Sequence, residues 1–143
     1  MGIEPLDFYT VARLVSDTGL FILIWIVQLV VYPGFGYYEH NNLKVWHDLY
    51  TKRITIVVMP LMLIQLSLSV YSFISNWDNA LQIFDTLLVL LTWITTFLVF
   101  VPLHNSIAKG LHVTSSVHKL VKYNWYRTVL WSALFFLTLY CMQ

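Results

Sequence analysis

The chain has 143 residues, of which 59% are hydrophobic, 17% aromatic and only 10% charged. A soluble domain of this length carries about a quarter charged residues, and it is too small to bury so much apolar surface. This composition excludes a soluble enzyme and a disordered segment, and the net charge of +1 excludes a nucleic-acid binder. The single cysteine, Cys141, excludes an internal disulfide framework and a cysteine-based zinc site.

Four apolar segments are long enough to cross a bilayer, which takes about 20 residues per helix. They cover approximately residues 14–32, 54–75, 80–101 and 125–142. Because the hydrocarbon offers no water to the backbone, these segments are expected to be helices. The sequence therefore predicts an all-α protein in which residues 1–143 form a single transmembrane domain. Its expected architecture is an integral membrane four-helix antiparallel bundle in contact with the lipid bilayer.

Charge is distributed unevenly between the two ends of this predicted bundle. Long connections at residues 33–53 and 102–127 hold seven of the eight basic residues, whereas the opposite end holds Arg13 and five acidic residues. The positive-inside rule places both long connections in the cytoplasm. Both termini and the tight turn at residues 76–79 are then expected on the outer side.

The two halves of the chain share a weak repeat. In each half a span that contains a tryptophan, Trp25 or Trp93, is predicted to end at a proline, Pro33 or Pro102. A polar cytoplasmic segment then follows in both halves.

All five histidines lie in the two long connections, and none lies in a span. Histidine is the usual acid or base near neutral pH, and His47 and His104 are closest to span ends, where a bundle can position them. His104, His112 and His118 are separated by eight and six residues, which does not match the spacing of a helical metal pair, so no metal site is predicted. The cofactor is unknown, with haem held by two histidines on helical extensions as one alternative.

Polar residues recur at helical spacing near the cytoplasmic ends of the spans. Gln28 and Tyr32 share one face of the first span, and Asn124 and Arg127 share one face at the start of the fourth. Gln28, Arg53, Asn124 and Arg127 are expected to line a polar pocket, where the two arginines stabilise negative charge. The alternative is that each arginine extends to lipid phosphates.

The resulting candidate site has two parts. The candidate catalytic residues are His47, His104, Arg53 and Arg127. The candidate ligand-binding residues are Gln28, Tyr32, Trp46, Tyr50, Asn124 and Trp131.

Two polar contacts are predicted deeper in the bundle. Asp17 follows Arg13 by four residues, which is the spacing of an ion pair on one helix face. Gln65 lies near the middle of the second span, and Thr92, Thr95 and Thr96 lie near the middle of the third. A hydrogen bond between Gln65 and these threonines would hold the two helices together.

Several short motifs resemble a family of small four-span bacterial inner-membrane proteins to which no activity is assigned. The resemblance covers the segment 25–35 with its Tyr-Pro-x-Phe element, the segment 47–53 with His-x-x-Tyr-x-x-Arg, and Asn-Trp-x-Arg-Thr at 124–128. It implies a bacterial inner (cytoplasmic) membrane location, in which the charge distribution makes both termini periplasmic. The second half is also similar to anthrone-oxygenase-like membrane proteins, which act on flat aromatic polyketides without a cofactor.

These observations predict a small multi-span membrane protein that binds a lipophilic small molecule, such as a quinone, an isoprenoid or an aromatic metabolite, at the cytoplasmic end of the bundle. Oxidoreductase chemistry on that molecule is one expectation, and whether the protein is an enzyme stays open. The first alternative is a non-catalytic accessory or scaffold subunit, with other membrane subunits or a second copy of the chain as partners. The second alternative is a haem-binding membrane protein.

Overall fold

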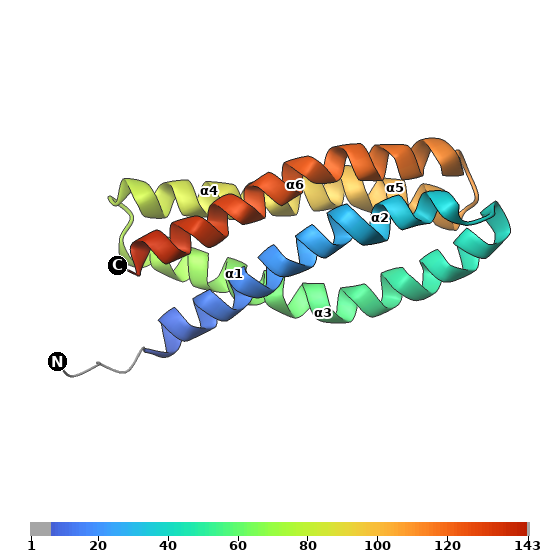
Figure 1. Cartoon of the computed structure of the whole chain (residues 1–143). Helices are drawn as coiled ribbons and strands as arrows, with labels where there is room; N and C mark the ends of the chain where they lie inside the picture. The colour runs from blue at the N-terminus through green and yellow to red at the C-terminus, as the bar shows by residue number, and fades with distance from the viewer. Residues whose placement is uncertain (1–6, 143) are drawn as a thin grey trace.

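The computed structural model describes residues 7–142, which form four helical rods joined by short turns (Figure 1). The first rod comprises α1 (Phe8–Ile26), η1 (Val27–Val31), α2 (Tyr32–Gly34) and η2 (Phe35–Tyr37). The second rod is α3 (His40–Ser75), and the fourth is α6 (Val113–Cys141). The third rod comprises α4 (Ala80–Thr95), η3 (Thr96–Phe100) and α5 (Val101–Ala108).

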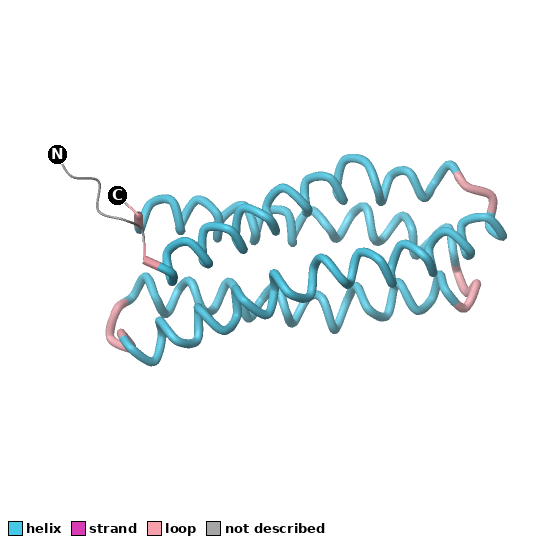
Figure 2. The backbone as a smooth tube through the Cα atoms, turned by 90° about the horizontal axis from the view of Figure 1, so that it is seen from below, coloured by secondary structure: helices cyan, strands magenta, loops and turns pink. Residues whose placement is uncertain are grey.

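Each rod packs against two neighbours and runs antiparallel to both. α1 contacts α3 and α6, and α4 contacts the same two helices from the other side. Both ends of the described chain lie at one end of the bundle (Figures 1 and 2). The structure thus confirms the predicted all-α architecture with four helices.

Three rods are long and apolar enough to cross a membrane: Phe8–Tyr37, His40–Ser75 and Ala80–Ala108. The fourth helix, α6, is not among them. The predicted span at 125–142 is therefore not confirmed by length and composition.

The bundle differs from a soluble protein in which side chains are buried and which are exposed. The interior of the described chain holds as many polar or charged side chains as hydrophobic ones, sixteen of each. Large apolar side chains cover the outside, and Val30, Ile56 and Leu98 are 65%, 74% and 73% exposed. An apolar exterior of this extent matches a hydrocarbon environment, because soluble monomers rarely expose large apolar patches.

Helix continues past both prolines, where the sequence predicts that two spans end. In each case a π-helical turn comes just before the proline: η1 precedes Pro33 and η3 precedes Pro102. Proline lacks an N–H group and its ring clashes with the carbonyl four residues earlier, so the wider turn lets the helix accommodate it. Most of the predicted connections 33–53 and 102–127 is consequently helical.

The turns between rods are short. Asn79, the last residue of the predicted 76–79 turn, caps the N-terminus of α4. Its side-chain oxygen accepts a hydrogen bond from the Leu81 amide at 2.9 Å. At the other end of the bundle, the chain turns between α5 and α6 through Gly110 and His112, whose φ angles are +72° and +48°. Glycine adopts such angles without strain, whereas histidine does so uncommonly.

A buried ionic network joins α1, α3, α4 and α6 at the end where the termini lie. Arg13 Nε donates to Asp17 at 2.6 Å, and its two terminal nitrogens donate to both carboxylate oxygens of Asp85. Gln65 and Thr138 donate to Asp17, and Ser69 Oγ donates to Asp85 at 2.7 Å. The predicted Arg13–Asp17 pair is confirmed.

The predicted bond between Gln65 and Thr92, Thr95 or Thr96 is wrong, because all three threonine hydroxyls donate to carbonyls of their own rod. The Gln65 amide donates to Asp17, and its oxygen accepts from Trp131 Nε1 at 3.3 Å. The Thr92 hydroxyl donates instead to the Val89 carbonyl of its own helix. A threonine hydroxyl in a helix can satisfy itself on the preceding turn, so its polarity does not require a partner on another helix.

Candidate functional site

Two of the predicted histidines meet inside the bundle at the end opposite the termini. His47 on α3 and His104 on α5 are joined by a 2.8 Å hydrogen bond between His47 Nε2 and His104 Nδ1. The other ring nitrogen of His104, Nε2, lies 3.0 Å from the Tyr32 hydroxyl. The two π-helical turns η1 and η3 lie immediately before the segments that carry Tyr32 and His104.

This chain of three side chains can exist in two hydrogen-bonded forms. If His47 donates to His104, the opposite nitrogen of His104 carries the hydrogen and donates to Tyr32. If Tyr32 donates to His104, the direction reverses and His104 donates to His47. His104 can therefore pass a proton between the other two groups by changing its tautomer. His47 Nδ1, the far end of the chain, is buried without a hydrogen-bond partner.

Phe35 fixes the position of His47. The Phe35 ring is 1% exposed and packs edge-on against His47 and Tyr50, with ring centroids 5.7 and 5.4 Å apart. His47 itself is 1% exposed and does not line the cavity that borders His104, so it reaches that cavity only through its bond to His104.

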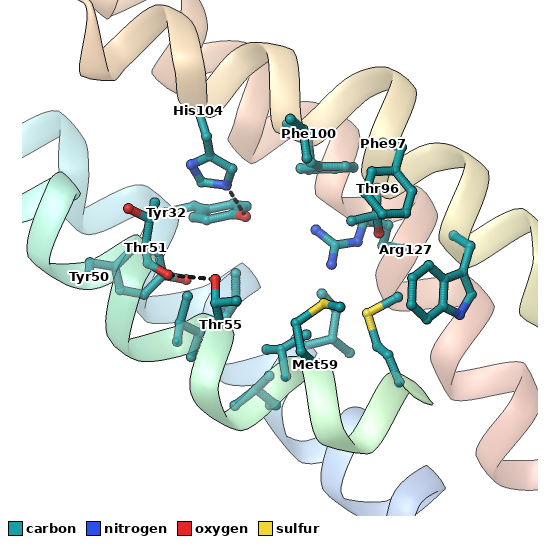
Figure 3. Close-up of a pocket in the computed structure, with 18 of the residues that line it drawn as sticks. Tyr32, Tyr50, Thr51, Thr55, Met59, Thr96, Phe97, Phe100, His104 and Arg127 are labelled. Atoms are coloured by element: carbon teal, nitrogen blue, oxygen red, sulfur yellow. Dashed lines mark hydrogen bonds between the residues drawn. The ribbon is translucent and has the colours of Figure 1, made fainter. Parts of the chain in front are cut away.

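A cavity of about 350 Å³ lies next to His104, between α3 and the third rod, and reaches α1 and α6. Its polar lining comes from Tyr32, Tyr50, Thr51, Thr55, Thr96, His104, Asn105 and Arg127. The rest of the lining is apolar and includes Trp131. Met59, Phe97 and Phe100 are labelled in Figure 3. The volume is in the range typical of small-molecule sites, which are mostly apolar with a few placed polar groups.

Arg127 projects from α6 into this cavity (Figure 3). Its guanidinium carbon lies 4.3 Å from the centre of the Phe100 ring and 4.7 Å from that of Trp131. The residue is 7% exposed, and its Nε has no hydrogen-bond partner. Arg127 thus lies inside the bundle, between two aromatic rings.

The structure brings together six of the ten predicted site residues. Tyr32, His47, Tyr50, His104, Arg127 and Trp131 line the cavity or contact a residue that does. Arg53 and Trp46 are exposed on α3 and do not line the cavity, because they lie on the outer face of that helix.

Gln28 and Asn124 are buried but do not reach the cavity either. The Asn124 amide donates to Gln28 Oε1 at 2.9 Å, and the Gln28 amide donates to the Val121 carbonyl at 3.3 Å. These side chains hold the first rod against α6. The expectation that Gln28, Arg53, Asn124 and Arg127 line one pocket is therefore correct only for Arg127.

We expect the Gln28–Asn124 contact to contribute modestly to stability. In a double-mutant cycle with Gln28→Leu and Asn124→Leu, the coupling energy should be about 0.6 kcal/mol, the average for interhelical hydrogen bonds in a membrane. The measurement is the free energy of unfolding in a titration with SDS. A coupling energy near zero would contradict the assignment of this bond as a link between helices.

Sequence reasoning missed the aromatic and hydroxyl residues that complete the cavity. Thr51 and Thr55 follow Tyr50 at i+1 and i+5, and Phe97 and Phe100 precede His104. Nothing in their local sequence distinguishes them from lipid-facing residues. A helical projection that placed Tyr50 toward the bundle would have placed Ile54 and Val58 with it, and both do line the cavity.

The arrangement of the histidine pair also bears on the haem alternative. Two axial imidazoles must direct nitrogens at one iron from opposite sides. Here His47 Nε2 and His104 Nδ1 are directed at each other, at hydrogen-bonding distance. The pair as arranged does not fit axial ligation of a haem between its two rings.

The fold and the site together define a class: an all-helical protein with three candidate membrane-crossing helices and a half-open, largely apolar cavity that is lined by a buried arginine and a histidine. Comparisons of the chain with protein-family models, with curated proteins and with solved structures find no match.

Proposed function

We propose that this protein is a four-span membrane protein that binds a lipophilic small molecule in the cavity between α3 and the third rod. The observation that carries the proposal is the cavity itself, which combines an apolar lining with the polar groups of His104, Tyr32 and Arg127. Quinones, isoprenoids and aromatic metabolites share the required chemistry, since each joins an apolar body to a polar end or rim.

The aromatic content of the cavity favours a ligand with a flat ring. Phe97, Phe100, Trp93 and Trp131 contribute rings from the third rod and α6, and Tyr32 and Tyr50 contribute phenols. Ring faces pack well against flat apolar ligands, while the phenol hydroxyls remain available for hydrogen bonds.

His104 gives the site an acid/base group. It lines the cavity, and its bonds to His47 and Tyr32 provide both a source and an acceptor for a proton. Proton transfer at a ligand oxygen accompanies oxidation or reduction of quinones and phenols, so this geometry supports oxidoreductase-type chemistry at His104.

The proposal includes a bacterial inner membrane, with α6 as the fourth span and both termini periplasmic. α6 packs along α1, α4 and α5, so it lies beside two of the three rods that are apolar enough to cross a membrane. Exposed Lys44, Lys52, Lys109 and Lys122 lie at the end away from the termini, which the positive-inside rule assigns to the cytoplasm.

The orientation can be tested by cysteine labelling. In a Cys141→Ser background, Trp77→Cys should react with a membrane-impermeant maleimide in intact spheroplasts, because Trp77 is 72% exposed in the turn between α3 and α4. Lys109→Cys, in the turn at the other end, should react only after the membrane is permeabilised. Labelling of Lys109→Cys in intact spheroplasts would contradict the proposed topology.

Filling the cavity tests ligand binding directly. Thr55→Trp places a large side chain in the cavity, so we expect it to lose a lipophilic molecule that the unaltered protein retains through mild purification. Val57→Trp is the matched control, because Val57 is 50% exposed on the same helix and does not line the cavity. The measurement is mass spectrometry of organic extracts. Equal material in all three extracts, or none in any, would overturn the proposed function.

A further inference from the structure

Resting on the proposed function, we infer that the cavity recognises an oxyanion on its ligand, such as a carboxylate, a phosphate or a phenolate, and that Arg127 is the residue that binds it. The inference goes beyond a lipophilic ligand, because it assigns the ligand a negatively charged end and places that end beside α6.

The first argument is that Arg127 has no carboxylate partner. Within residues 7–142 the ion pairs are Arg13–Asp17, Arg13–Asp85 and Lys52–Asp48. An arginine that is 7% exposed and lacks a counterion carries a large desolvation cost. Proteins normally pair such a charge, and the other buried arginine of this chain, Arg13, has two carboxylates.

The second argument is that the aromatic contacts of Arg127 offset only part of this cost. A cation over an aromatic face is attracted by the ring quadrupole, but this attraction is weaker than that of a paired carboxylate. Phe100 and Trp131 supply two such faces, but a ring accepts no conventional hydrogen bond from the edge of the guanidinium. The Nε of Arg127 remains without a partner.

The third argument is the direction of the side chain. Arg127 points into the cavity, toward space that is also bordered by Tyr32 and His104 (Figure 3). A guanidinium binds carboxylates and phosphates through paired N–H groups, so an oxyanion in this space would supply the missing counterion. The hydroxyl of Tyr32 and the ring of His104 would be available to the same head group, and the aromatic rings to the apolar part.

A pair of probes of nearly equal shape tests the charge requirement: 2-naphthoate, which is an anion at pH 7.5, and neutral 2-naphthamide. Binding is measured by equilibrium dialysis against the full-length protein in phosphatidylcholine nanodiscs, with empty nanodiscs as the blank. We expect the protein to bind 2-naphthoate at least about tenfold more tightly than 2-naphthamide, since a hydrogen bond to a charged group contributes about 1.5–3 kcal/mol.

The variants identify the residue responsible. Arg127→Gln should remove the preference for the anion while retaining 2-naphthamide binding, which also shows that the variant is folded. Arg127→Lys should keep part of the preference, because it keeps the charge without the fork geometry. Lys122→Gln, an exposed position on the same helix, should leave the preference unchanged and so exclude a general effect of surface charge.

Each outcome has a distinct meaning. Equal binding of both probes that is lost in Thr55→Trp would overturn the oxyanion assignment and leave cavity binding intact. Binding of neither probe above the blank would overturn both. A second set of nanodiscs with phosphatidylglycerol distinguishes two natural sources of the oxyanion: competition assigns it to an acidic lipid, and unchanged 2-naphthoate binding assigns it to a non-lipid acid.

Discussion

Replacing Arg13 by glutamine should reduce the free energy of unfolding by about 3–5 kcal/mol, the cost of breaking a buried ion pair by removing one partner. Arg13 is 6% exposed and is the cation that neutralises Asp17 and Asp85. Its removal leaves two carboxylates close together inside the bundle without a positive charge. The measurement is unfolding by SDS in mixed micelles, followed by far-UV circular dichroism.

The chain contains a control with the same spacing and a different environment. Lys52 and Asp48 also form an i, i+4 ion pair at 2.6 Å, but their side chains are 72% and 59% exposed. Lys52→Gln should therefore cost only about 0.3–0.5 kcal/mol. Equal losses for Arg13→Gln and Lys52→Gln would contradict the view that burial gives the Arg13 network its importance.

Removing one carboxylate from the network should reduce the free energy of unfolding less than removing its arginine. Asp85→Asn leaves the Arg13–Asp17 pair on α1 with one charge of each sign, so we expect it to lose less stability than Arg13→Gln. A larger loss in Asp85→Asn would indicate that the link from α1 to α4, and not charge balance, governs the stability of this end of the bundle.

Replacing Trp131 by alanine should reduce the free energy of unfolding by about 3–5 kcal/mol, because it removes the largest fully buried side chain of the described chain. Trp131 is 1% exposed and packs in the same cluster as Leu20, Met62 and Leu134. The loss also removes one of the two rings that contact Arg127. The same SDS titration measures it.

Two further tryptophan variants separate packing from hydrogen bonding. Trp77→Ala, in a turn where the ring is 72% exposed, should change the free energy of unfolding by less than about 0.5 kcal/mol. Trp131→Phe keeps a ring but loses the N–H donor to Gln65, so we expect an intermediate loss. If Trp131→Phe were as damaging as Trp131→Ala, the hydrogen bond and not the packing would dominate.

Trp131 also connects the two polar regions of the bundle. Its ring contacts Arg127 in the cavity, and its Nε1 donates to Gln65, whose amide donates to Asp17 in the ionic network. If filling the cavity moves Trp131, the movement would change both its contact with Arg127 and its hydrogen bond to Gln65. The Trp131→Phe variant breaks that chain at one bond and keeps the cavity wall.

Properties that depend on neighbouring residues in the chain could be predicted from the sequence. Continuous apolar segments predict helices, because hydropathy and helix length are local features, and the four rods confirm them. The i, i+4 spacing predicts the Arg13–Asp17 pair for the same reason. The asparagine-rich turn between α3 and α4 contains its own N-cap.

The candidate site was predicted only in part, because its members come from different rods. The hydrogen bond from Arg13 to Asp85 and that between His47 and His104 join residues 72 and 57 positions apart. Local spacing carries no information about such pairs. In the sequence, Arg53 and Arg127 each stand at the start of an apolar segment. In the structure, Arg53 is exposed and Arg127 is buried.

The amino-acid sequence by itself determined that the chain forms long apolar helices with basic residues gathered at one end. The tertiary structure alone decided which polar side chains face one another. The physical reason is the rotation of each helix about its axis. A π-helical turn inserts one residue and so rotates everything after it by about 100°. Two such turns, η1 and η3, precede Tyr32 and His104, and hydropathy does not reveal them.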